Sequence, residues 1–284
     1  MADIYIDGDF LPEKEAKLSV LDRAVQLGDG LFETIRGHLG KPAFLDRHLE
    51  RLHSSAAFMK IPFNRGDAEI RDILVELCRR NNAPEARIRL TLTRGIHPGG
   101  LALEGGAPSL IATAEKYIPH PPEKYKKGYK LVVSRIIHYS KDALAGHKTL
   151  NYLPFLLARD ETAAAGADEA LLLNEHGNVA ECSSASIFCV SGGKLITPGL
   201  DSGILPGVVR DIIIELATGD GIPVEEKPLP LDEMLGAREV FITSSLRGVM
   251  PVSQIGENIF KQERPVTEKL SHLYSEALDA VCRG

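Results

Sequence analysis

Residues 86–93 alternate strictly between apolar and polar side chains, and this pattern constrains the fold more than any other part of the sequence. The apolar positions are Ile88, Leu90 and Leu92, and the intervening positions are Arg87, Arg89, Thr91 and Thr93. A period of two is that of a β-strand, in which successive side chains point to opposite faces of a sheet. The segment therefore predicts a strand with an apolar back and a basic front.

Two segments that precede this strand have the helical period instead. Residues 45–59 place one apolar stripe along a helix, made of Leu45, Leu49, Leu52, Ala56 and Met59. A second helix is expected to begin with Asp67 as its N-cap and to bury Ile70, Ile73, Leu74 and Leu77. Helices followed by a strand predict an α/β arrangement for the first third of the chain.

Residues 117–124 contain three prolines within four positions. Proline lacks a backbone N–H and resists both helix interiors and central strands, so this segment predicts a linker. With 284 residues, the chain is long enough for two modest domains. We expect a small N-terminal α/β domain over residues 1–117, a linker over 118–124 and a larger domain over 125–284.

The larger domain is expected to combine short strands with helices. Strands are predicted at 129–138, 170–174, 179–182, 187–190 and 239–243, with turns at His176-Gly-Asn178 and at Gly192-Gly193. Helices are predicted after Lys148, from Pro206 and near 266–282. The predicted fold class of the whole chain is α/β, with an α+β character.

Composition excludes several kinds of function. A formal net charge of −6 and a pI near 5.9 argue against nucleic-acid binding, which needs a basic footprint. No apolar run reaches the length of about 18 residues that a membrane-spanning helix needs, so no membrane partner is expected. The four cysteines form no Cys-x-x-Cys pair, which suggests neither a metal site nor a disulfide framework. We expect a cytoplasmic protein.

Five segments, in order, carry a family resemblance. They are Leu21-Asp-Arg-Ala-Val-Gln-Leu-Gly-Asp-Gly-Leu-Phe-Glu-Thr-Ile-Arg36, His48-Leu-Glu-Arg-Leu52, Lys148-Thr-Leu-Asn-Tyr152, Asn178-Val-Ala-Glu-Cys-Ser-Ser184 and Gly203-Ile-Leu-Pro-Gly-Val-Val-Arg-Asp211. Together they resemble the class IV, fold-type IV enzymes that use pyridoxal 5'-phosphate. The resemblance implies a small α/β domain, a larger domain with a pseudo-barrel of strands and helices, and a homodimer.

Lys148, Tyr152 and Glu181 are the residues to which the resemblance gives chemistry. A lysine amine can form a Schiff base with an aldehyde cofactor and then move a proton between the substrate Cα and the cofactor's C4'. The resemblance implies that Lys148 is this catalytic residue. It implies that Glu181 keeps the pyridine nitrogen protonated and that Tyr152 hydrogen-bonds the phenolic oxygen. Tyr152 shares a face with Lys148 if a helix has already begun there.

A cofactor phosphate needs several hydrogen-bond donors. The predicted helix start at Gly207, Val208 and Val209 offers backbone N–H groups and the positive end of a helix dipole. By resemblance, Arg51 is the phosphate-binding arginine, whose charged hydrogen bonds are strong. Ser245 matches a hydroxyl residue of the last phosphate-binding loop.

A substrate carboxylate needs an arginine or a group of backbone donors. The candidates are Arg36, Arg87, Arg89 and Arg247. Arg87 and Arg89 share a strand face, so both can point into one pocket or merely solvate that face. The glycine-rich segment 95–106 is a candidate specificity loop over the substrate.

The resemblance leaves the reaction open among related activities. The leading hypothesis is an aminotransferase that exchanges the amino group between an amino acid, of the branched-chain or D-amino acid type, and a 2-keto acid. The alternative is an aminodeoxychorismate lyase that releases 4-aminobenzoate and pyruvate. A third possibility is a non-catalytic, cofactor-binding regulatory protein. Residue types in the substrate-facing segments match no single subfamily, so the enantiomer preference stays open.

Overall fold

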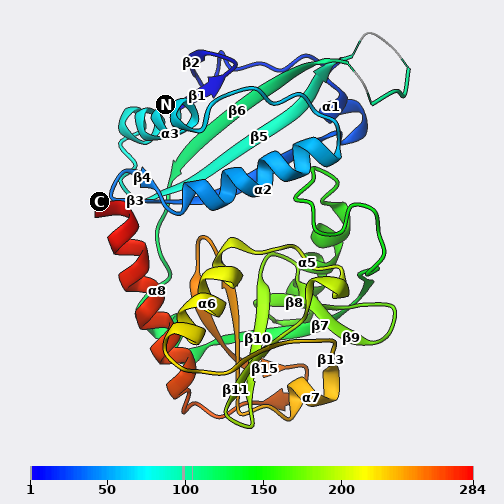
Figure 1. Cartoon of the computed structure of the whole chain (residues 1–284), viewed down its shortest axis with the longest axis vertical. Helices are drawn as coiled ribbons and strands as arrows, with labels where there is room; N and C mark the ends of the chain where they lie inside the picture. Colours follow the sequence, from blue (N-terminus) through cyan, green and yellow to red (C-terminus); the bar gives the residue numbers. More distant parts are fainter. Residues whose placement is uncertain (1, 98–99, 104, 284) are drawn as a thin grey trace. The chain divides into compact units, whose positions relative to one another are not determined.

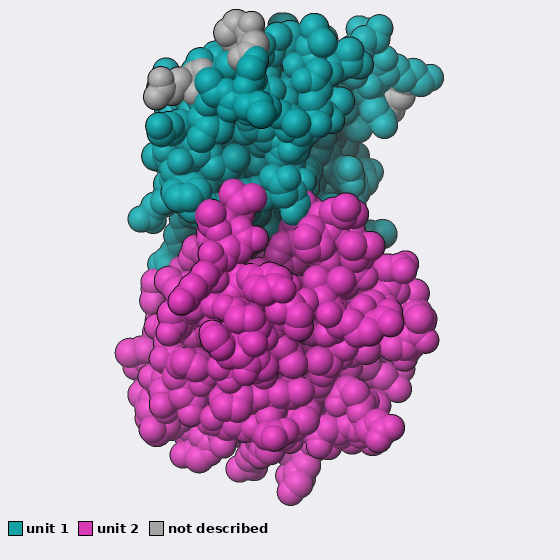
Figure 2. All heavy atoms as spheres, turned by 90° about the vertical axis from the view of Figure 1, so that its right-hand side faces the viewer, with its two compact units in different colours: residues 1–118, 147–151, 278–284 teal, residues 119–146, 152–277 magenta. Residues whose placement is uncertain are grey.

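The computed structural model describes residues 2–97, 100–103 and 105–283. The chain divides into two compact units, which Figure 2 colours separately. Unit 1 comprises Met1–Ile118, His147–Asn151 and Leu278–Gly284, and unit 2 comprises Pro119–Gly146 and Tyr152–Ala277. Unit 1 thus takes up two short segments that the predicted domain ranges assigned to the larger domain. Of the predicted specificity loop 95–106, Pro98, Gly99 and Glu104 lie outside the described residues.

Unit 1 contains a six-stranded antiparallel sheet with the order β2-β1-β6-β5-β3-β4. Its strands are β1 (Asp3–Ile6), β2 (Asp9–Pro12), β3 (Gly30–His38), β4 (Lys41–Pro42), β5 (Ala86–Ile96) and β6 (Ala107–Lys116). Its helices are α1 (Arg23–Leu27), α2 (Leu45–Phe58) and α3 (Asp67–Arg80). α2 and α3 pack against the sheet (Figure 1).

The alternation at 86–93 has the predicted consequence in β5. Ile88, Leu90 and Leu92 are buried in the unit 1 core, where they meet the apolar stripes of α2 and α3. On the opposite face Arg87 is exposed and Arg89 is half-buried. The predicted strand and the predicted helix at 45–59 are both confirmed. Hydrophobic burial on one face of β5 fixes its register, because a slip of one residue would move every apolar side chain to the wrong face.

Unit 2 contains a ten-stranded mixed sheet, in which the path β12-β11-β10-β14-β15-β7-β8-β9-β13 is joined by β16 beside β15. The strands are β7 (Tyr129–Ile137), β8 (Glu169–Leu173), β9 (Asn178–Cys182), β10 (Ser186–Ser191), β11 (Lys194–Thr197), β12 (Val224–Glu226), β13 (Leu229–Pro230), β14 (Glu239–Ser244), β15 (Gly248–Ile255) and β16 (Asn258–Ile259). The helices are α4 (Pro122–Lys127), α5 (Leu153–Ala165), the 3₁₀ helix η1 (Leu200–Ser202), α6 (Val208–Gly219), α7 (Leu231–Leu235) and α8 (Pro265–Arg283), whose last residues belong to unit 1.

The unit 2 sheet curls into a half-barrel around its own apolar core. β9 and β10 are far apart in the sheet order. Nevertheless, Cys182 at the end of β9 forms an antiparallel bridge with Ala185 just before β10, so the sheet curls back on itself. The enclosed core includes Ile187, Val240 and Met250. The mixed α/β fold class that the sequence predicts, including the barrel-like larger domain, is confirmed.

Three local expectations were wrong or need correction. Asp67 is the first residue of α3, and Gly66 is the N-cap, so the side chain of Asp67 contributes acidic charge to the first turn rather than a cap. Pro206 does not open α6, which begins at Val208 after the N-cap Gly207. The predicted linker contains the start of α4 at Pro122, because proline is tolerated in the first turn of a helix.

Among the described residues, no helix combines the length and apolar character needed to cross a membrane.

Candidate functional site

Lys148 lies in unit 1, on a short segment that pairs with the start of β3. The N–H of Phe32 donates to the carbonyl oxygen of Lys148 at 2.9 Å, and the N–H of Leu150 donates to the carbonyl oxygen of Gly30 at 2.9 Å. A sheet edge therefore holds the backbone of Lys148. α5 begins only at Leu153, so the condition under which Lys148 and Tyr152 would share a helix face is not met.

Gly30 makes this pairing possible. A Cβ added to Gly30 would lie 2.7 Å from Cδ1 of Leu150 and 2.8 Å from the carbonyl oxygen of Leu92. Both distances are too short for a methyl group, and the second involves backbone that cannot swing away. Glycine is thus required where the segment that carries Lys148 approaches β3.

The side chains of Lys148 and Arg89 both contact the ring of Phe32. Nζ of Lys148 is 4.6 Å from the ring centroid, and the guanidinium carbon of Arg89 is 3.9 Å from it. Phe32 pairs with Thr91 across β3 and β5, and Arg89 is two residues from Thr91, so Phe32 and Arg89 occupy the same face of the sheet. An amine and a guanidinium therefore flank one aromatic ring.

Arg51 is held by a buried carboxylate that the sequence analysis did not single out. Nε of Arg51 donates to Glu33 at 2.8 Å, and a terminal nitrogen donates to its second oxygen at 2.5 Å. Nδ1 of His48 also lies 2.7 Å from Glu33, which is 1% exposed. Burial opposes ionisation of Glu33, but Arg51 and His48 outweigh it and lower its pKa to about 2. Burial also lowers the pKa of His48, which favours a neutral ring.

The other two arginine candidates of unit 1 have different surroundings. A terminal nitrogen of Arg36 pairs with Glu85, and its guanidinium carbon lies 4.2 Å from the ring centroid of Tyr117. Arg36 is thus 7% exposed and paired within the protein. Arg87 is exposed, and it lies opposite Arg36 in the β3–β5 register.

In unit 2, Ser186 and Arg210 lie close to Gly207 at the start of α6. A Cβ on Gly207 would lie 2.5 Å from Oγ of Ser186 and 3.2 Å from Cβ of Arg210. Glycine at the N-cap supplies no side-chain hydrogen bond to the first N–H groups of α6, which include those of Val208 and Val209. Backbone donors at a helix start suit an anion such as a phosphate.

Glu181 lies in β9 and is 6% exposed. Its Oε1 accepts a long hydrogen bond of 3.4 Å from the N–H of Leu205 and lies 3.7 Å from Nε2 of His138. Nε2 of His138 also lies 2.8 Å from the carbonyl oxygen of Gly203, which indicates that this nitrogen carries the proton. The Glu181 carboxylate is therefore buried, with one backbone N–H and one imidazole beside it.

Tyr152, Ser245 and Arg247 complete the predicted residues of unit 2. Tyr152 is the N-cap of α5, and its hydroxyl donates to the carbonyl oxygen of Ser183 at 2.8 Å. Ser245 lies in the turn between β14 and β15. Arg247, in the same turn, pairs with buried Glu169 at 2.9 Å.

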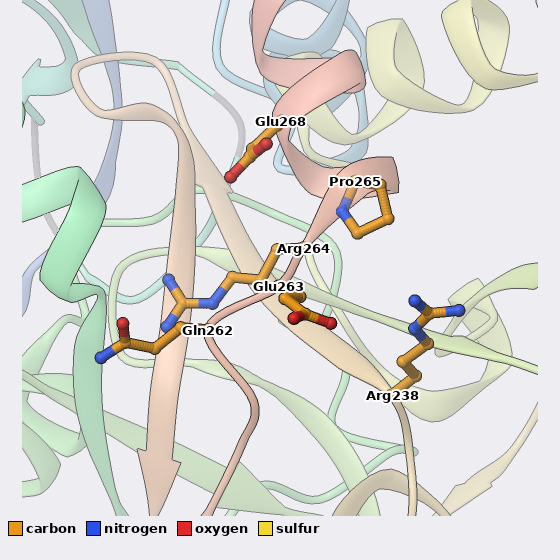
Figure 3. Close-up of a pocket in the computed structure, with 6 residues that line it drawn as sticks. All are labelled: Arg238, Gln262, Glu263, Arg264, Pro265 and Glu268. Atoms are coloured by element: carbon orange, nitrogen blue, oxygen red, sulfur yellow. The ribbon is translucent and has the colours of Figure 1, made fainter.

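The structure also has an open cavity of about 460 Å³ in unit 2 (Figure 3). Its lining residues are Arg238, Gln262, Glu263, Arg264, Pro265 and Glu268. None of them belongs to the predicted site, and two arginines with two glutamates give the cavity no net charge. We assign it no part in the chemistry.

Comparison with known proteins identifies the family. The family model of class IV amino-transferases matches residues 30–255, which covers most of the chain. The chain belongs to the class IV aminotransferases. These enzymes depend on pyridoxal 5'-phosphate, so the predicted family, enzyme class and cofactor are confirmed.

The sequence relatives of this class IV aminotransferase differ in activity. A protein of Methanocaldococcus jannaschii, provisionally named a branched-chain-amino-acid aminotransferase, is 37% identical over 96% of this chain and 95% of its own length. A D-alanine aminotransferase of Listeria monocytogenes is 28% identical over 98% and 97%. An aminodeoxychorismate lyase of Bacillus subtilis is 31% identical over 97% and 94%.

Similar solved structures include two of these activities. The branched-chain aminotransferase of the archaeon Thermoproteus uzoniensis, solved with norvaline, has a TM-score of 0.90 and 29% identity, over 98% of this chain and 95% of its own. The 4-amino-4-deoxychorismate lyase of Pseudomonas aeruginosa has a TM-score of 0.87 and 32% identity, over 97% and 99%. The class IV fold is therefore shared by both activities.

The residues of this class IV aminotransferase suit pyridoxal phosphate. The backbone N–H groups at the start of α6, which no N-cap side chain engages, suit its phosphate, and Lys148 offers an amine. Sequence reasoning missed Glu33, although it stands inside the Phe-Glu-Thr-Ile-Arg motif, and it missed Phe32 in the same motif. An acid within the otherwise uncharged, strand-like run of residues 31–35 was the available signal.

Proposed function

We propose that this protein is an aminotransferase that exchanges the amino group between an amino acid and a 2-keto acid, with Lys148 as its catalytic residue. The observation that carries the proposal is the shared contact of Lys148 and Arg89 with the ring of Phe32. An amine that reacts at Cα and a guanidinium that binds a carboxylate are the two groups that an α-amino acid requires.

The proposed cofactor contacts come from the predicted residues. Lys148 would bond the aldehyde carbon, and Glu181 would lie at the pyridine nitrogen. Arg51 and Ser245 would bind the phosphate together with the N–H groups of Val208 and Val209 behind Gly207. Tyr152 would hydrogen-bond the phenolic oxygen as the acceptor, because its own hydroxyl proton is donated to Ser183. Glu33 acts through Arg51, because two hydrogen bonds fix the plane of that guanidinium. Bound pyridoxal phosphate supplies electron withdrawal from the substrate Cα.

Lys148 moves the proton in this proposal. With an amino acid bound, its Nζ would take the proton from the substrate Cα, which is general acid–base work by a positioned amine. The pairing of its backbone with β3 limits where Nζ can reach, and the Phe32 ring supports the side chain. Precise placement of this kind supplies much of the rate of a proton transfer.

Arg89 is the proposed partner of the substrate carboxylate. Arg36 and Arg247 are each paired with a carboxylate of the protein, Glu85 and Glu169 respectively. Arg87 lies two residues beyond Arg89 on the same face of β5, further from Phe32 in the register of β3 and β5. The contact with the Phe32 ring, which Arg89 shares with Lys148, favours Arg89 among the four candidates.

A half-reaction screen tests the proposal. Purified protein loaded with pyridoxal phosphate is mixed with paired L- and D-amino acids, and absorbance reports the conversion of the cofactor. We expect loss of the visible band with branched-chain amino acids or with D-alanine, the substrates in the names of the relatives. A band that no amino acid of either hand diminishes would overturn the proposal and favour a non-catalytic cofactor-binding protein.

A lyase is the second candidate, supported by the similarity to the lyases of Bacillus subtilis and Pseudomonas aeruginosa. Incubation with aminodeoxychorismate separates the two reactions. Formation of 4-aminobenzoate and pyruvate without an added keto acid would establish the lyase. We expect none.

We further propose a cytoplasmic homodimer, as the family resemblance implies. All four cysteines, Cys78, Cys182, Cys189 and Cys282, are free and buried in the described structure, which suits a reducing compartment. Light scattering coupled to size exclusion tests the assembly, and a mass equal to one chain would contradict it.

A further inference from the structure

Unit 2 contains a buried ion pair, Glu169 with Arg247, that touches the segments around three proposed cofactor contacts. Glu169 is the first residue of β8 and is fully buried. Its Oε2 accepts hydrogen bonds from Arg247 at 2.9 Å, from Arg159 at 2.9 Å and from the hydroxyl of Ser184 at 2.6 Å. One carboxylate thus joins β8, α5, the loop after β9 and the turn after β14.

Arg247 donates hydrogen bonds to two of these segments. One terminal nitrogen donates to the carbonyl oxygen of Ser184 at 2.9 Å and to its hydroxyl at 2.6 Å. Its Nε donates to the hydroxyl of Ser244 at 3.0 Å. Ser244 precedes Ser245 directly, so the guanidinium ties the proposed phosphate-binding turn to the loop that follows Glu181.

Ser183 connects this network to Tyr152. Its hydroxyl donates to Oε1 of Glu169, and its carbonyl oxygen accepts the hydrogen bond of the Tyr152 hydroxyl at 2.8 Å. The N–H of Ser183 donates to the carbonyl oxygen of Ala170, next to Glu169, at 2.9 Å. Tyr152 is therefore linked to the Glu169 carboxylate through a single residue, Ser183.

The charges of Glu169 and Arg247 stabilise each other. Burial raises the energy of the charged Glu169, but Arg247 and the hydroxyls of Ser183 and Ser184 outweigh it and lower its pKa. Burial likewise opposes the charge of Arg247, and Glu169 reverses that effect and raises the pKa of Arg247. Such a pair stays ionised, and removal of one partner leaves the other charge buried and uncompensated.

We propose that Glu169 and Arg247 form a positioning pair that fixes Tyr152 and Ser245 for the cofactor, and that Arg247 binds no substrate carboxylate. This inference rests on the proposed cofactor contacts and goes beyond them. It predicts that the pair acts on cofactor affinity and on the environment of the phosphate rather than on recognition of the amino acid.

Arg247→Gln and Arg159→Gln form a matched pair of variants. Both remove one cation from the same oxygen of Glu169, but only Arg247 also holds Ser184 and Ser244. The dissociation constant of pyridoxal phosphate is measured by equilibrium dialysis against the apo protein, and phosphorus NMR reports the bound phosphate. Thermal unfolding of each apo variant records the structural effect.

We expect Arg247→Gln to raise the dissociation constant about 10-fold and to shift the phosphorus resonance, since hydrogen bonds from a charged group are lost. Arg159→Gln should change the constant less than about 3-fold and leave the resonance in place. With saturating cofactor, the KM for the amino acid should stay within about 2-fold of wild type in both, because an arginine without substrate contact makes no ground-state binding difference.

Two results would overturn the inference. One is wild-type cofactor affinity in Arg247→Gln with a raised KM, which would make Arg247 a substrate residue. The other is an equal loss of cofactor affinity in both variants, which would mean that the pair stabilises the fold and does not position the cofactor contacts. If Arg247→Gln does not fold, Arg247→Lys gives the same readouts, because it keeps the charge but not the fork of donors. These binding measurements need no turnover, so wild-type protein that binds cofactor but transfers no amino group would contradict only the proposed function.

Discussion

At the scale of single residues, the proposed contact with the substrate carboxylate is Arg89, which lies over the same Phe32 ring as Lys148. Arg89→Lys removes the planar fork of donors but keeps the charge. We expect the KM for the amino acid to rise about 10- to 100-fold, since a charged hydrogen bond is lost. Arg87→Lys, on the same strand face, is the control and should change KM less than about 2-fold. Equal effects of the two variants in steady-state kinetics would contradict the assignment.

Glu33 gives a prediction about pH. Its pKa falls from an ordinary value near 4.5 to about 2 in the folded protein. A lowered carboxyl pKa stabilises the fold above the unfolded value, and this contribution is lost as the pH falls from about 4.5 towards 2. Urea unfolding should therefore show a loss on the order of 3 kcal/mol in wild type over this window. Glu33→Gln should lack that part of the slope, while exposed Glu50→Gln should keep it.

The sequence can nominate reactive residues, but it does not identify the partners of charged side chains. Lys148 and Glu181 stand in ordered motifs, so their candidacy needs no structure. The partners of Arg36 and Arg247 are Glu85 and Glu169, which are 49 and 78 residues away along the chain. Nothing local marks such a pair, because charged side chains are paired by the fold and not by spacing. All four arginines therefore look equivalent in sequence.

At the scale of elements, periodicity was a sound guide where one face is buried. The stripes at 45–59 and 86–93 predicted α2 and β5, whose apolar sides form the unit 1 core. Ends of elements were less predictable, since Asp67 and Pro206 both suit several positions near a helix start. The pairing of 147–151 with β3 had no local signal, because two short backbone segments far apart in sequence create it.

Gly30 tests that pairing. Gly30→Ala places a methyl group against the backbone of Leu92 and the side chain of Leu150. We expect a loss of stability of about 1–3 kcal/mol and weaker attachment of the cofactor to Lys148, because the segment must move away. Gly219→Ala, at the end of α6, is the control, since no atom lies within 4 Å of its added Cβ and its backbone is not in the left-handed region. Equal free energies of unfolding for the two variants would contradict the close contact of Gly30 with Leu92 and Leu150.

At the scale of the whole molecule, the units did not follow contiguous ranges. The predicted boundary at 117–124 came from prolines, whereas the segments 147–151 and 278–284 join unit 1 through long-range packing. Sequence can indicate where a chain breaks, but not which later segment returns to an earlier core.

Binding of the cofactor should stabilise the molecule as mass action requires. At a free concentration about 100 times the dissociation constant, pyridoxal phosphate should add about 2.7 kcal/mol to the free energy of unfolding. Arg51→Gln should need more cofactor to reach the same shift of Tm, because the phosphate loses a charged donor. A thermal shift in Arg51→Gln that matches wild type at every concentration would remove Arg51 from the site.

The central claim is that Lys148 bonds the cofactor, and reduction followed by peptide mapping tests it most directly. Borohydride makes the link between pyridoxal phosphate and a lysine permanent, so mass spectrometry can identify the modified residue. We predict that the label is on Lys148 in wild type and that Lys148→Ala loses both the label and the visible absorbance band. A label on another lysine, or a band that persists in Lys148→Ala, would contradict the account.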